Sequence, residues 1–506
     1  MRKFINQLFR SYYKQRYRSI QHYMQHPHEV QQALLKQLIE TTRHTVWGKN
    51  YGYKHIHSIK DFMDRVPVNH YEDVKPYIQR MMYGEKDVLW SGQVRWFSKS
   101  SGTTSDKSKY IPVTSQSRKY CHIRGTWDTM TLFYHNRPDA RQFECKSLLM
   151  GGSIERFPAY PKTMIGDVSA IMISHMPFVG RPFFIPDFNT ALLSNWEEKL
   201  EKLAKIAAAT PNLVMIGGVP TWTVVLLRRI LELTKKQHLL EVWPAIQGYI
   251  HGGVSFIPYK EQFKSFFPSD TFSYQETYNA SEGFFAVQDD FGTNDMLLLL
   301  DNGIYYEFLP VEEWNKEYPR AIPLSEVEVG KNYALVISTN AGLWRYILGD
   351  TIIFTSTYPY KIQVTGRTKQ FVNAFGEEVM VDNTDKALAK TCEETHATVI
   401  DYTVAPVYFR QGERGRHEWL IEFEQAPANL ALFSQLLDKN LQAINSDYEA
   451  KRFKSIALER LELRVLHPGT FQQWMRAKGK LGGQHKVPRL ANDRKFIEEI
   501  LSFADV

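Results

Sequence analysis

The sequence has little cysteine and no long apolar run. Only three cysteines occur among 506 residues, Cys121, Cys145 and Cys392, and their wide spacing contains no Cys-x-x-Cys pair. This spacing offers no disulfide framework, argues against structural zinc and suits a reducing compartment. No apolar stretch approaches the length of a membrane-spanning helix, and no internal repeat or low-complexity segment is visible. We therefore expect a cytoplasmic protein without an integral membrane segment.

The chain also lacks a strong excess of either charge. It carries 62 Lys and Arg against 55 Asp and Glu, which gives a formal net charge of +7. That value is mild for this length and does not indicate a nucleic-acid-binding protein. Hydrophobic residues make up 43% and aromatic residues 13%, enough to bury large cores. The length fits about three domain-sized units.

The N-terminal stretch is basic, because six Lys or Arg precede the first acidic residue, Glu29. Apolar residues from Ile5 to Met24 recur at helical spacing, without the compact apolar core of a signal peptide. A basic amphipathic helix either lies on a membrane surface or docks on its own protein. We expect docking on the protein, followed by a second helix over residues 30–45.

Predicted strands and helices alternate from about residue 60 to residue 360, which favours an α/β body with antiparallel parts. Helices are expected over residues 196–209 and 221–235, and strands over residues 246–250 and 333–339. Residues 211–218 are interpreted as a helix stop followed by a buried strand. Asp301-Asn302-Gly303 separates two apolar runs, residues 296–300 and 304–308, and predicts a β-hairpin. Residues 344–354 are expected to form two short strands that are broken at Gly349-Asp350.

The pattern changes near residue 362, where a polar break, Thr365–Lys369, follows. Beyond this break, helices are predicted over residues 382–394 and 430–450 and from residue 470, with strands over residues 397–409, 418–423 and 461–466. These elements make a smaller α+β unit that is plausible as a separate domain. The sequence therefore predicts a body of residues 1–364 and a C-terminal domain of residues 365–506.

A loop rich in serine and threonine, residues 98–109, is the most distinctive stretch of the body. It also holds Gly102 and three lysines, and it lies between two predicted strands. Hydroxyl and backbone N–H groups can donate to phosphate oxygens, a glycine lets the backbone approach closely, and lysines supply positive charge. The second glycine and following lysine of the common nucleotide-binding loop are missing. A solvated Ser/Thr turn is an equally good interpretation of this stretch alone.

Three further polar clusters follow predicted strands. The first, residues 251–254, offers two glycines against which a flat ring can lie. The second, residues 274–283, provides an aromatic ring and a carboxylate, Glu282, which beside a phosphate loop is a natural magnesium ligand. The third, residues 344–350, places Asp350 after a tight turn, where an acid can grip vicinal ribose hydroxyls. Turn capping or an ion pair explains each acid singly, but the ordered set indicates a nucleotide site.

The C-terminal domain carries a glycine- and lysine-rich loop, residues 478–486. On a mobile domain such a loop can act as a lid that delivers a cation. Its alternative is a solvated surface loop.

The order of these motifs resembles the acyl-adenylate-forming superfamily of firefly luciferase and the acyl-CoA synthetases. It is more similar still to the plant auxin-responsive acyl-acid amido synthetases (the Gretchen Hagen family) and their bacterial relatives, nearly end to end. The motifs are Ser-Ser-Gly-Thr-Thr at 100–104, Tyr-Asn-Ala-Ser-Glu-Gly at 278–283, Tyr-x-x-Gly-Asp ending at Asp350, Gly366-Arg367 and the lysine loop. Residues 45–51 and 486–489 support the resemblance.

The resemblance implies a ligase that uses ATP and Mg²⁺. A carboxylic acid attacks the α-phosphorus of ATP to give acyl-AMP and pyrophosphate, and an amine, usually an amino acid, then attacks the acyl carbon and expels AMP. The C-terminal domain is expected to close over the body. The expected partners are a small-molecule acid and an amine, without nucleic acid, and the expected state is a monomer.

The resemblance also assigns roles to individual residues. Glu282 is the expected metal ligand and a catalytic residue, and Lys486 is the expected catalytic lysine, favoured over Lys478 and Lys480. Met215 and Trp222 are candidate acyl-pocket walls, with ordinary core packing as an equal alternative. ATP or AMP binding is assigned to Ser100, Ser101, Gly102, Thr103, Thr104, Lys109, Gly252, Gly253, Val254, Tyr278, Asn279, Ala280, Ser281, Glu282, Asp350 and Arg367.

Two departures from the family pattern leave alternatives open. Ser105-Asp106 stand where the superfamily usually keeps glycine, which puts an extra acid close to the phosphates. The ribose motif carries one extra residue, so that either Arg345-Tyr346 or Tyr346-Ile347 is the aligned pair. An acyl-CoA ligase, which differs in the acceptor, and a non-catalytic adenylate-binding protein are the competing functions.

Overall fold

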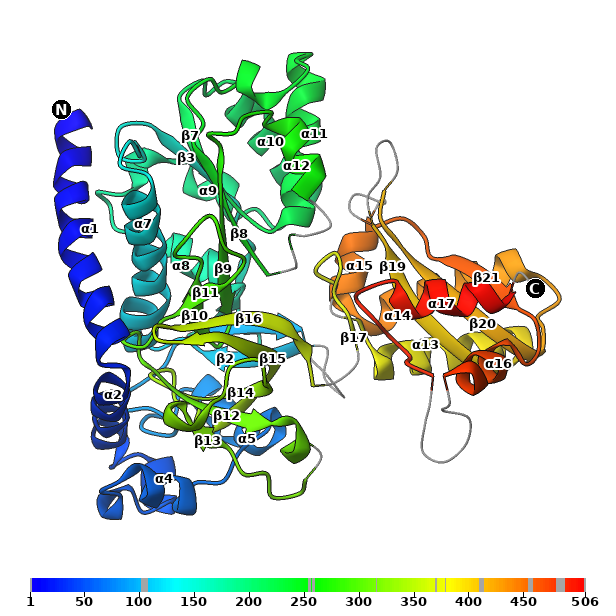
Figure 1. The fold of residues 1–506 in the computed structure, drawn as a ribbon, viewed down its shortest axis with the longest axis horizontal. Coiled ribbons are helices and arrows are strands. Elements are labelled where there is room, and N and C mark those ends of the chain that lie inside the picture. The colour runs from blue at the N-terminus through cyan, green and yellow to red at the C-terminus, as the bar shows by residue number, and fades with distance from the viewer. Residues whose placement is uncertain are drawn as a thin grey trace.

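The computed structural model describes residues 2–101, 108–253, 256, 260–314, 316–368, 371–377, 379–408, 414–453, 458–478 and 487–504. They form a large mixed α/β body and a smaller α+β unit at the C-terminus (Figure 1). The predicted fold class is confirmed.

A twelve-stranded mixed sheet runs through the body in the order β13-β12-β14-β15-β16-β11-β10-β9-β8-β7-β3-β6. Its parallel half consists of β3 (Lys146–Leu149), β6 (Phe184–Ile185), β7 (Leu213–Gly217), β8 (Gly248–Gly252) and β9 (Ser273–Ala280). Its antiparallel half consists of β10 (Gly283–Val287), β11 (Met296–Leu298), β12 (Ile304–Pro310), β13 (Ile322–Pro323), β14 (Asn332–Thr339), β15 (Tyr346–Thr357) and β16 (Tyr360–Arg367). The halves meet where β10 turns back and pairs antiparallel with β9. The sheet changes there from parallel to antiparallel pairing. In α/β proteins, ligands bind at the carboxyl ends of parallel strands next to such a change of topology.

A second, four-stranded sheet holds the loop rich in serine and threonine. Its order is β2 (Ser108–Pro112), β1 (Trp96–Ser101), β5 (Met164–Gly166) and β4 (Ile154–Arg156). Strands β1 and β2 are antiparallel, with Ser101 opposite Ser108. The prediction that this stretch lies between two strands is therefore confirmed, but its bounds are wrong, because residues 98–101 belong to β1 and residues 108–109 to β2.

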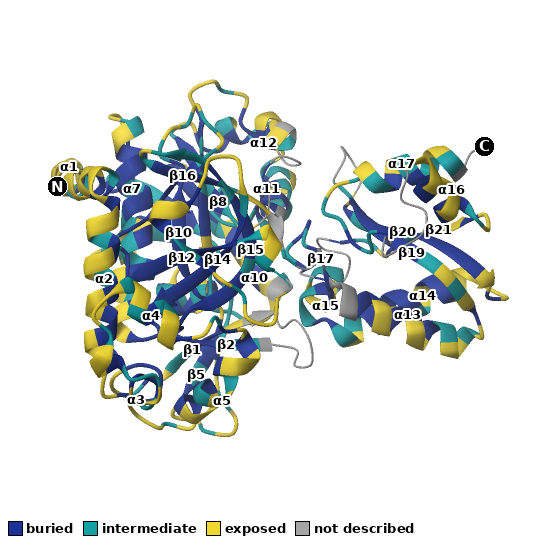
Figure 2. Ribbon diagram, turned by 60° about the horizontal axis from the view of Figure 1, so that its bottom comes forward, coloured by how far each residue is buried: buried dark blue, intermediate teal, exposed yellow. Residues whose placement is uncertain are grey.

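Helices cover the large sheet, whose strands are mostly buried (Figure 2). The predicted helices over residues 196–209 and 221–235 are confirmed, because the Asn195 side chain caps the first of them by accepting the Glu198 N–H, and Pro220 begins the second. The helices are α2 (Pro27–Thr42), α3 (Val46–Asn50), α4 (Ile59–Arg65), α5 (Tyr71–Met82), α6 (Ser115–Ser117), α7 (Arg124–Asn136), α8 (Val168–Ser174), α9 (Phe188–Ala191), α10 (Trp196–Ala208), α11 (Pro220–Thr234) and α12 (Lys260–Phe266).

The N-terminal helix α1 (Arg2–Gln25) docks on the body, as expected from its periodicity. Tyr13, Ile20 and Tyr23 are buried, and the helix lies along α7 (Figure 1). Arg16 fixes it in place, because its guanidinium donates to Asp128 at 2.7 Å and to Asp301 at 2.7 Å. Such forked pairs between a guanidinium and carboxylates add geometric specificity to the contact.

The hairpin predicted across Asp301-Asn302-Gly303 is wrong. Strand β11 pairs with β10 and β16, whereas β12 pairs with β13 and β14. Both apolar runs are buried, so each takes strand partners on both sides from elsewhere in the chain. The turn is held by contacts outside it, since Asp301 accepts from Arg16 and the Asn302 amide donates to the Phe284 carbonyl.

The two short strands predicted in residues 344–354 are one strand, β15, which runs through Gly349-Asp350. Its register against β14 shifts there, because Ile347 faces Val336 and Thr351 faces Ala334. Gly349 has φ +96°, a left-handed conformation that glycine adopts without strain. The chain therefore bulges at this point and continues, and the bulge presents Asp350.

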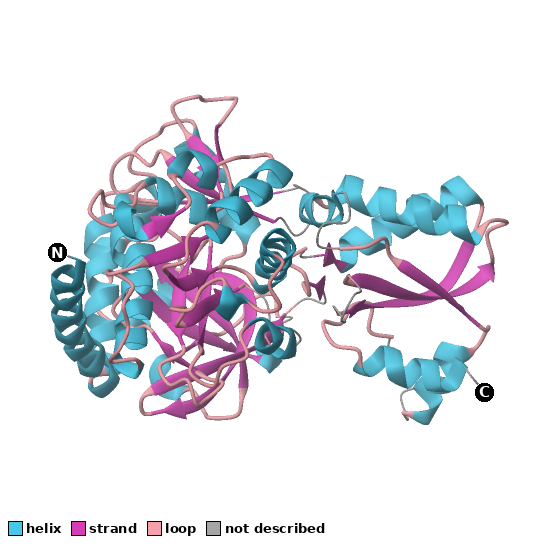
Figure 3. Ribbon diagram, turned by 90° about the horizontal axis from the view of Figure 1, so that it is seen from above, coloured by secondary structure: helices cyan, strands magenta, loops and turns pink. Residues whose placement is uncertain are grey.

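The C-terminal unit has its own three-stranded sheet, β19 (Thr398–Val407), β20 (Arg416–Gln425) and β21 (Glu462–Leu466). Helices α13 (Val381–Thr395) and α14 (Leu430–Ile444) cover one face, and α16 (Thr470–Ala477) and α17 (Lys495–Ala504) cover the other (Figures 2 and 3). The single helix predicted over residues 430–450 is two, because the chain bends at Asn445, whose side chain caps α15 (Ser446–Arg452). A short hairpin, β17 (Phe371–Val372) and β18 (Val379–Met380), belongs to the same unit, because Val372 and Val379 are buried in one cluster with Trp419 of β20.

Within the described ranges, no helix is both long and apolar enough to cross a membrane.

Candidate active site

Strand β1, which leads into the hydroxyl-rich loop, contacts the Tyr278–Gly283 motif, although the two are far apart in the sequence. The Ser98 hydroxyl, at the start of the hydroxyl-rich stretch, donates to the Ser281 hydroxyl at 2.8 Å. Ser98 lies on β1, and Ser281 lies in the tight turn between β9 and β10. Two segments that the sequence linked only by motif order therefore share one site.

The proposed ribose acid joins the same site. The Tyr278 hydroxyl donates to Asp350 Oδ2 at 2.8 Å, and both side chains are buried. Lys109 Nζ lies 3.5 Å from the Tyr346 hydroxyl and over the ring of Tyr71. These contacts bring β2, β9 and the bulged strand β15 together, so an aromatic ring, a carboxylate and a cation surround one region.

The glycine pair contributes the neighbouring strand end. Strand β8 runs parallel to β9, and the Thr277 hydroxyl donates to the His251 carbonyl at 3.0 Å. A Cβ atom on Gly252 would lie 2.3 Å from the Thr277 carbonyl oxygen, so only glycine fits there. His251 is buried against the ring of Phe256, and burial lowers its pKa to about 3, which keeps the imidazole neutral near pH 7.

Glu282 is buried beside Ser281, in the turn that connects β9 to β10. Among the described residues, no group of three or more His, Cys, Asp or Glu side chains converges on a metal-sized space. Mg²⁺ commonly takes one or two protein carboxylates together with substrate phosphates and water. Glu282, next to the hydroxyl-rich loop, therefore fits as a ligand of magnesium that arrives with a nucleotide.

Several predicted residues lie outside the described residues or are described only by their backbone. Arg367 lies opposite Asp350 in the β15–β16 ladder, which brings the Gly-Arg hinge next to the proposed ribose acid. Ser100 and Ser101 continue β1, and the backbone of Asn279 and Ala280 continues β9. The residues outside the description are Gly102, Thr103, Thr104, Val254, Lys480 and Lys486.

Arg345 is committed to a structural contact. Its guanidinium pairs with Glu307 at 2.8 Å, and both side chains are buried. It also donates to the carbonyls of Met63 at 2.8 Å and Val66 at 2.6 Å. The neighbouring Tyr346 instead faces Lys109, so it is Tyr346 that turns toward the site.

The two acyl-pocket candidates do not lie together. Met215 on β7 is buried in a cluster with Tyr13 and Phe133, between the sheet and the helix pair α1 and α7. Trp222 on α11 faces the C-terminal unit, where the Lys451 ammonium lies 4.3 Å from the centre of its ring. Core packing accounts for Met215, whereas Trp222 lies at the boundary between the body and the C-terminal unit.

Of the three lysines in the C-terminal loop, the structure describes Lys478. Its Nζ lies 2.9 Å from Glu499 on α17, an exposed pair of the C-terminal unit.

Glu276 is a further residue of the candidate site, and the motifs in the sequence assigned it no role. It lies on β9, opposite His251 and two residues before Tyr278, so its side chain is on the same face of the strand as Tyr278. Burial raises its pKa to about 7. Its place within the Tyr274–Gly283 stretch was visible in the sequence, but its burial depends on strands that only the fold brings together.

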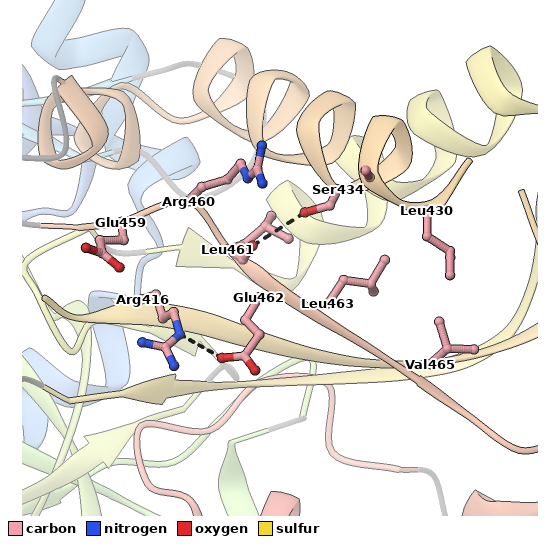
Figure 4. Close-up of a pocket in the computed structure, with 10 residues that line it drawn as sticks. Arg416, Leu430, Ser434, Glu459, Arg460, Leu461, Glu462, Leu463 and Val465 are labelled. Carbon is pink, nitrogen blue, oxygen red and sulfur yellow. Dashed lines mark hydrogen bonds and ion pairs between the residues drawn. The ribbon is translucent and has the colours of Figure 1, made fainter. Parts of the chain in front are cut away.

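A cavity of about 770 Å³ among the described residues is remote from this site. It opens on the C-terminal unit between α14 and β21, where Arg416 pairs with Glu462 at 2.7 Å (Figure 4). None of the residues that line this cavity belongs to the four polar clusters. The lining residues are Arg416, Leu430, Ala431, Ser434, Glu459, Arg460, Leu461, Glu462, Leu463 and Val465. The candidate site at the ends of β8 and β9 and the bulge of β15 therefore rests on the chemistry of its side chains and on their contacts.

Comparison with known families matches nearly the whole chain to one of them. The GH3 family N-terminal domain matches residues 16–272, the GH3 family central domain residues 297–367, and the GH3 family C-terminal domain residues 382–495. The central match ends at Arg367, where β16 ends.

Curated relatives and solved structures agree with this match. Indole-3-acetic acid-amido synthetase GH3.3 of Arabidopsis thaliana is 24% identical, over 93% of this chain and 90% of its own length. Jasmonoyl-L-amino acid synthetase JAR4 of Nicotiana attenuata is 22% identical, over 91% and 90%. The solved structure of the GH3.15 acyl acid amido synthetase has a TM-score of 0.59 at 17% identity, and covers 94% of this chain and 93% of its own. The last comparison supports the fold.

Proposed function

This chain belongs to the GH3 family, and we propose that it is an ATP-dependent acyl acid amido synthetase. It joins a carboxylic acid to an amine, in this proposal an amino acid, through an acyl-AMP intermediate. The relatives named above act on different acids, so the proposal carries over the reaction type and leaves the acid open.

In the first step a carboxylate oxygen attacks the α-phosphorus of ATP, and pyrophosphate leaves. Two anions repel each other, so the site must supply donors and positive charge as they meet. The hydroxyl-rich loop, Lys109 and backbone N–H groups serve this purpose. Glu282 would hold Mg²⁺, which would neutralise phosphate charge when it is bound.

The nucleoside is held on the opposite side of the site. Gly252 and Gly253 give the adenine ring a flat surface at the end of β8, and Tyr278 lies beside it on β9. Asp350 accepts hydrogen bonds from the ribose hydroxyls, with its carboxylate positioned by the Tyr278 hydroxyl. Arg367, opposite Asp350 in the ladder, lies at the entrance to the C-terminal unit.

In the second step the amine nitrogen attacks the acyl carbon, the acyl–phosphate bond breaks, and AMP leaves. Because AMP is a good leaving group, this step needs mainly positioning of the amine and removal of its proton. We propose that the C-terminal unit, as a domain beginning at residue 365, closes over the body and that Lys486 provides a cation for the first step. Trp222 keeps a role in the acyl pocket in this proposal, and Met215 is the weaker candidate.

The main support for this proposal is that four polar clusters, far apart in the sequence, contact one another in the structure. The Ser98–Ser281, Thr277–His251 and Tyr278–Asp350 hydrogen bonds and the Lys109–Tyr346 contact connect all four polar clusters. A solvated turn would not require such convergence. The three free cysteines favour a reducing compartment, the cytoplasm in this proposal, and we propose that the protein works as a monomer.

The test is a two-stage activity screen. Acid-dependent exchange of pyrophosphate into ATP, measured with a panel of carboxylic acids and Mg²⁺, reports acyl-AMP formation. AMP release with each active acid is then measured with amino acids and, separately, with coenzyme A. Amide products support the proposal, thioester products would assign an acyl-CoA ligase instead, and AMP binding without exchange for any acid would indicate an adenylate-binding protein.

A further inference from the structure

The excess positive charge of this chain is concentrated in one helix. Helix α1 carries six of the 62 basic residues and no acidic residue. The rest of the chain therefore has 56 basic residues against 55 acidic ones, and is close to neutral. A net charge that is weak for the whole molecule is thus strong at one place.

Most of these cations are exposed and lack an acidic partner. Arg16 is used to anchor the helix to Asp128 and Asp301. Arg10 lies over Tyr134 and donates to the Ala140 carbonyl, which leaves its charge uncompensated. The exposed cations of α1 that make no ion pair among the described residues are Arg2, Lys3, Arg10, Lys14 and Arg18.

An exposed apolar row lies on the same outer side of α1. Phe4, Leu8 and Tyr12 follow each other at intervals of four residues and are 63%, 56% and 49% exposed. Residues at this spacing form one line along a helix. The buried residues Tyr13 and Ile20 point toward the body. The exposed line borders this docking face at Tyr12, whose ring meets the Trp127 ring of α7 edge-on at 5.4 Å.

We propose that the outer face of α1 docks on an anionic lipid bilayer surface. A row of cations next to an aromatic and aliphatic row matches the headgroup region, where cations meet lipid phosphates and apolar side chains enter the acyl boundary. The phosphates of a nucleic acid would pair with the cations but would offer no apolar surface to Phe4 and Leu8. A second copy of this face is disfavoured because two such rows of like charge repel each other.

The position of α1 suits this role. The helix lies on the outer flank of the body, at the end of the molecule opposite the C-terminal unit (Figures 1 and 3). A membrane bound there leaves the candidate active site and the C-terminal unit uncovered. Because Arg16 fixes the helix to two carboxylates of the body, the docked surface is part of the folded protein.

The test uses the full chain and sedimentation with vesicles of phosphatidylcholine, with and without phosphatidylserine. We expect binding to the anionic vesicles alone, weakened as salt is raised. Each basic residue near such a surface contributes about fivefold in partitioning, so Lys14→Glu with Arg18→Glu should lower binding by at least about 25-fold. Phe4→Ser with Leu8→Ser should also lower it, at unchanged net charge.

Matched variants separate this face from general effects. Lys54→Glu with Lys60→Glu makes the same charge change at two other exposed lysines, and Phe178→Ser with Val179→Ser removes two other exposed apolar side chains. Both controls should bind vesicles like the unchanged chain, and all variants should keep the same thermal unfolding midpoint. Equal binding to neutral and anionic vesicles, no vesicle binding, or losses as large in the controls would each overturn the proposal. Binding to double-stranded DNA or self-association through α1 in place of vesicle binding would also overturn it.

Discussion

Replacing Asp350 with alanine tests the proposed nucleoside site most directly. One carboxylate oxygen, Oδ2, already accepts the Tyr278 hydroxyl at 2.8 Å. We take one charge-assisted hydrogen bond from the ribose hydroxyls to this carboxylate. Such a bond contributes roughly 1.5–3 kcal/mol. Asp350→Ala should accordingly weaken AMP binding by about 10- to 150-fold.

The tyrosine gives this prediction a second arm. Tyr278→Phe leaves the carboxylate in place and removes the hydrogen bond that orients it, so AMP binding should fall by a smaller factor, about 2- to 10-fold. Because the two side chains act as a pair, the double variant should lose less than the product of the two single losses. If the losses of binding free energy in the two single variants simply add in the double variant, Tyr278 does not act through Asp350.

Titration calorimetry with AMP measures these affinities, and urea unfolding checks that each variant is folded. Asp295→Asn is the matched control. Asp295 directly precedes β11 and also accepts a hydrogen bond from a hydroxyl, that of Thr355 at 2.8 Å, but it belongs to none of the four clusters. It should leave AMP affinity within about twofold. If folded Asp350→Ala binds AMP as tightly as this control, the ribose assignment is refuted.

Three further predictions concern the chemistry and the pH dependence. Glu282→Gln should keep the fold and lower Mg²⁺-dependent pyrophosphate exchange more than about tenfold; normal exchange would remove Glu282 from the metal site. Lys486→Ala should slow single-turnover adenylation and spare amide formation from supplied acyl-AMP, with Lys478→Ala as control because Lys478 pairs with Glu499; equal losses in both steps would indicate a structural role. The folded pKa of Glu276 is raised from 4.5 to about 7, so the unfolded chain loses this proton first, and stability should fall as pH rises from about 4.5 to 7. Glu276 is half-buried. Glu276→Gln should therefore remove at most about 3 kcal/mol of that fall, measured by urea unfolding at pH 5 and pH 8. An unchanged dependence of the unfolding free energy on pH would contradict the raised pKa.

Local signals in the sequence predicted the elements whose stability is itself local. Helix α10 is marked by its Asn195 cap and its apolar periodicity, and α11 by Pro220 at its start. The hairpin at Asp301–Gly303 failed for the opposite reason. Its turn residues are typical, but strands β11 and β12 are both buried and pair with strands elsewhere in the chain.

The candidate site shows the same division. Motif order singled out Tyr278, Glu282 and Asp350, yet the bond between Tyr278 and Asp350 joins residues 72 positions apart. No periodicity encodes such a contact. The burial of Arg345 against Glu307 likewise depends on two strands meeting, which is why the sequence alone left its alignment open.

The ladder between Asp350 and Arg367 places the proposed nucleoside grip beside the exit to the C-terminal unit. Strand β16 ends at Arg367, and the chain leaves the large sheet there. If AMP binds one orientation of that unit more tightly than another, the orientation equilibrium must shift by the same factor when AMP binds. A substitution in the connecting segment can then change nucleotide affinity although the substituted residue does not contact the nucleotide. The size of that change in affinity measures the shift in free energy between the two orientations. AMP binding and the orientation of the C-terminal unit would form a single thermodynamic cycle. The β15–β16 ladder would be the element that takes part in both equilibria.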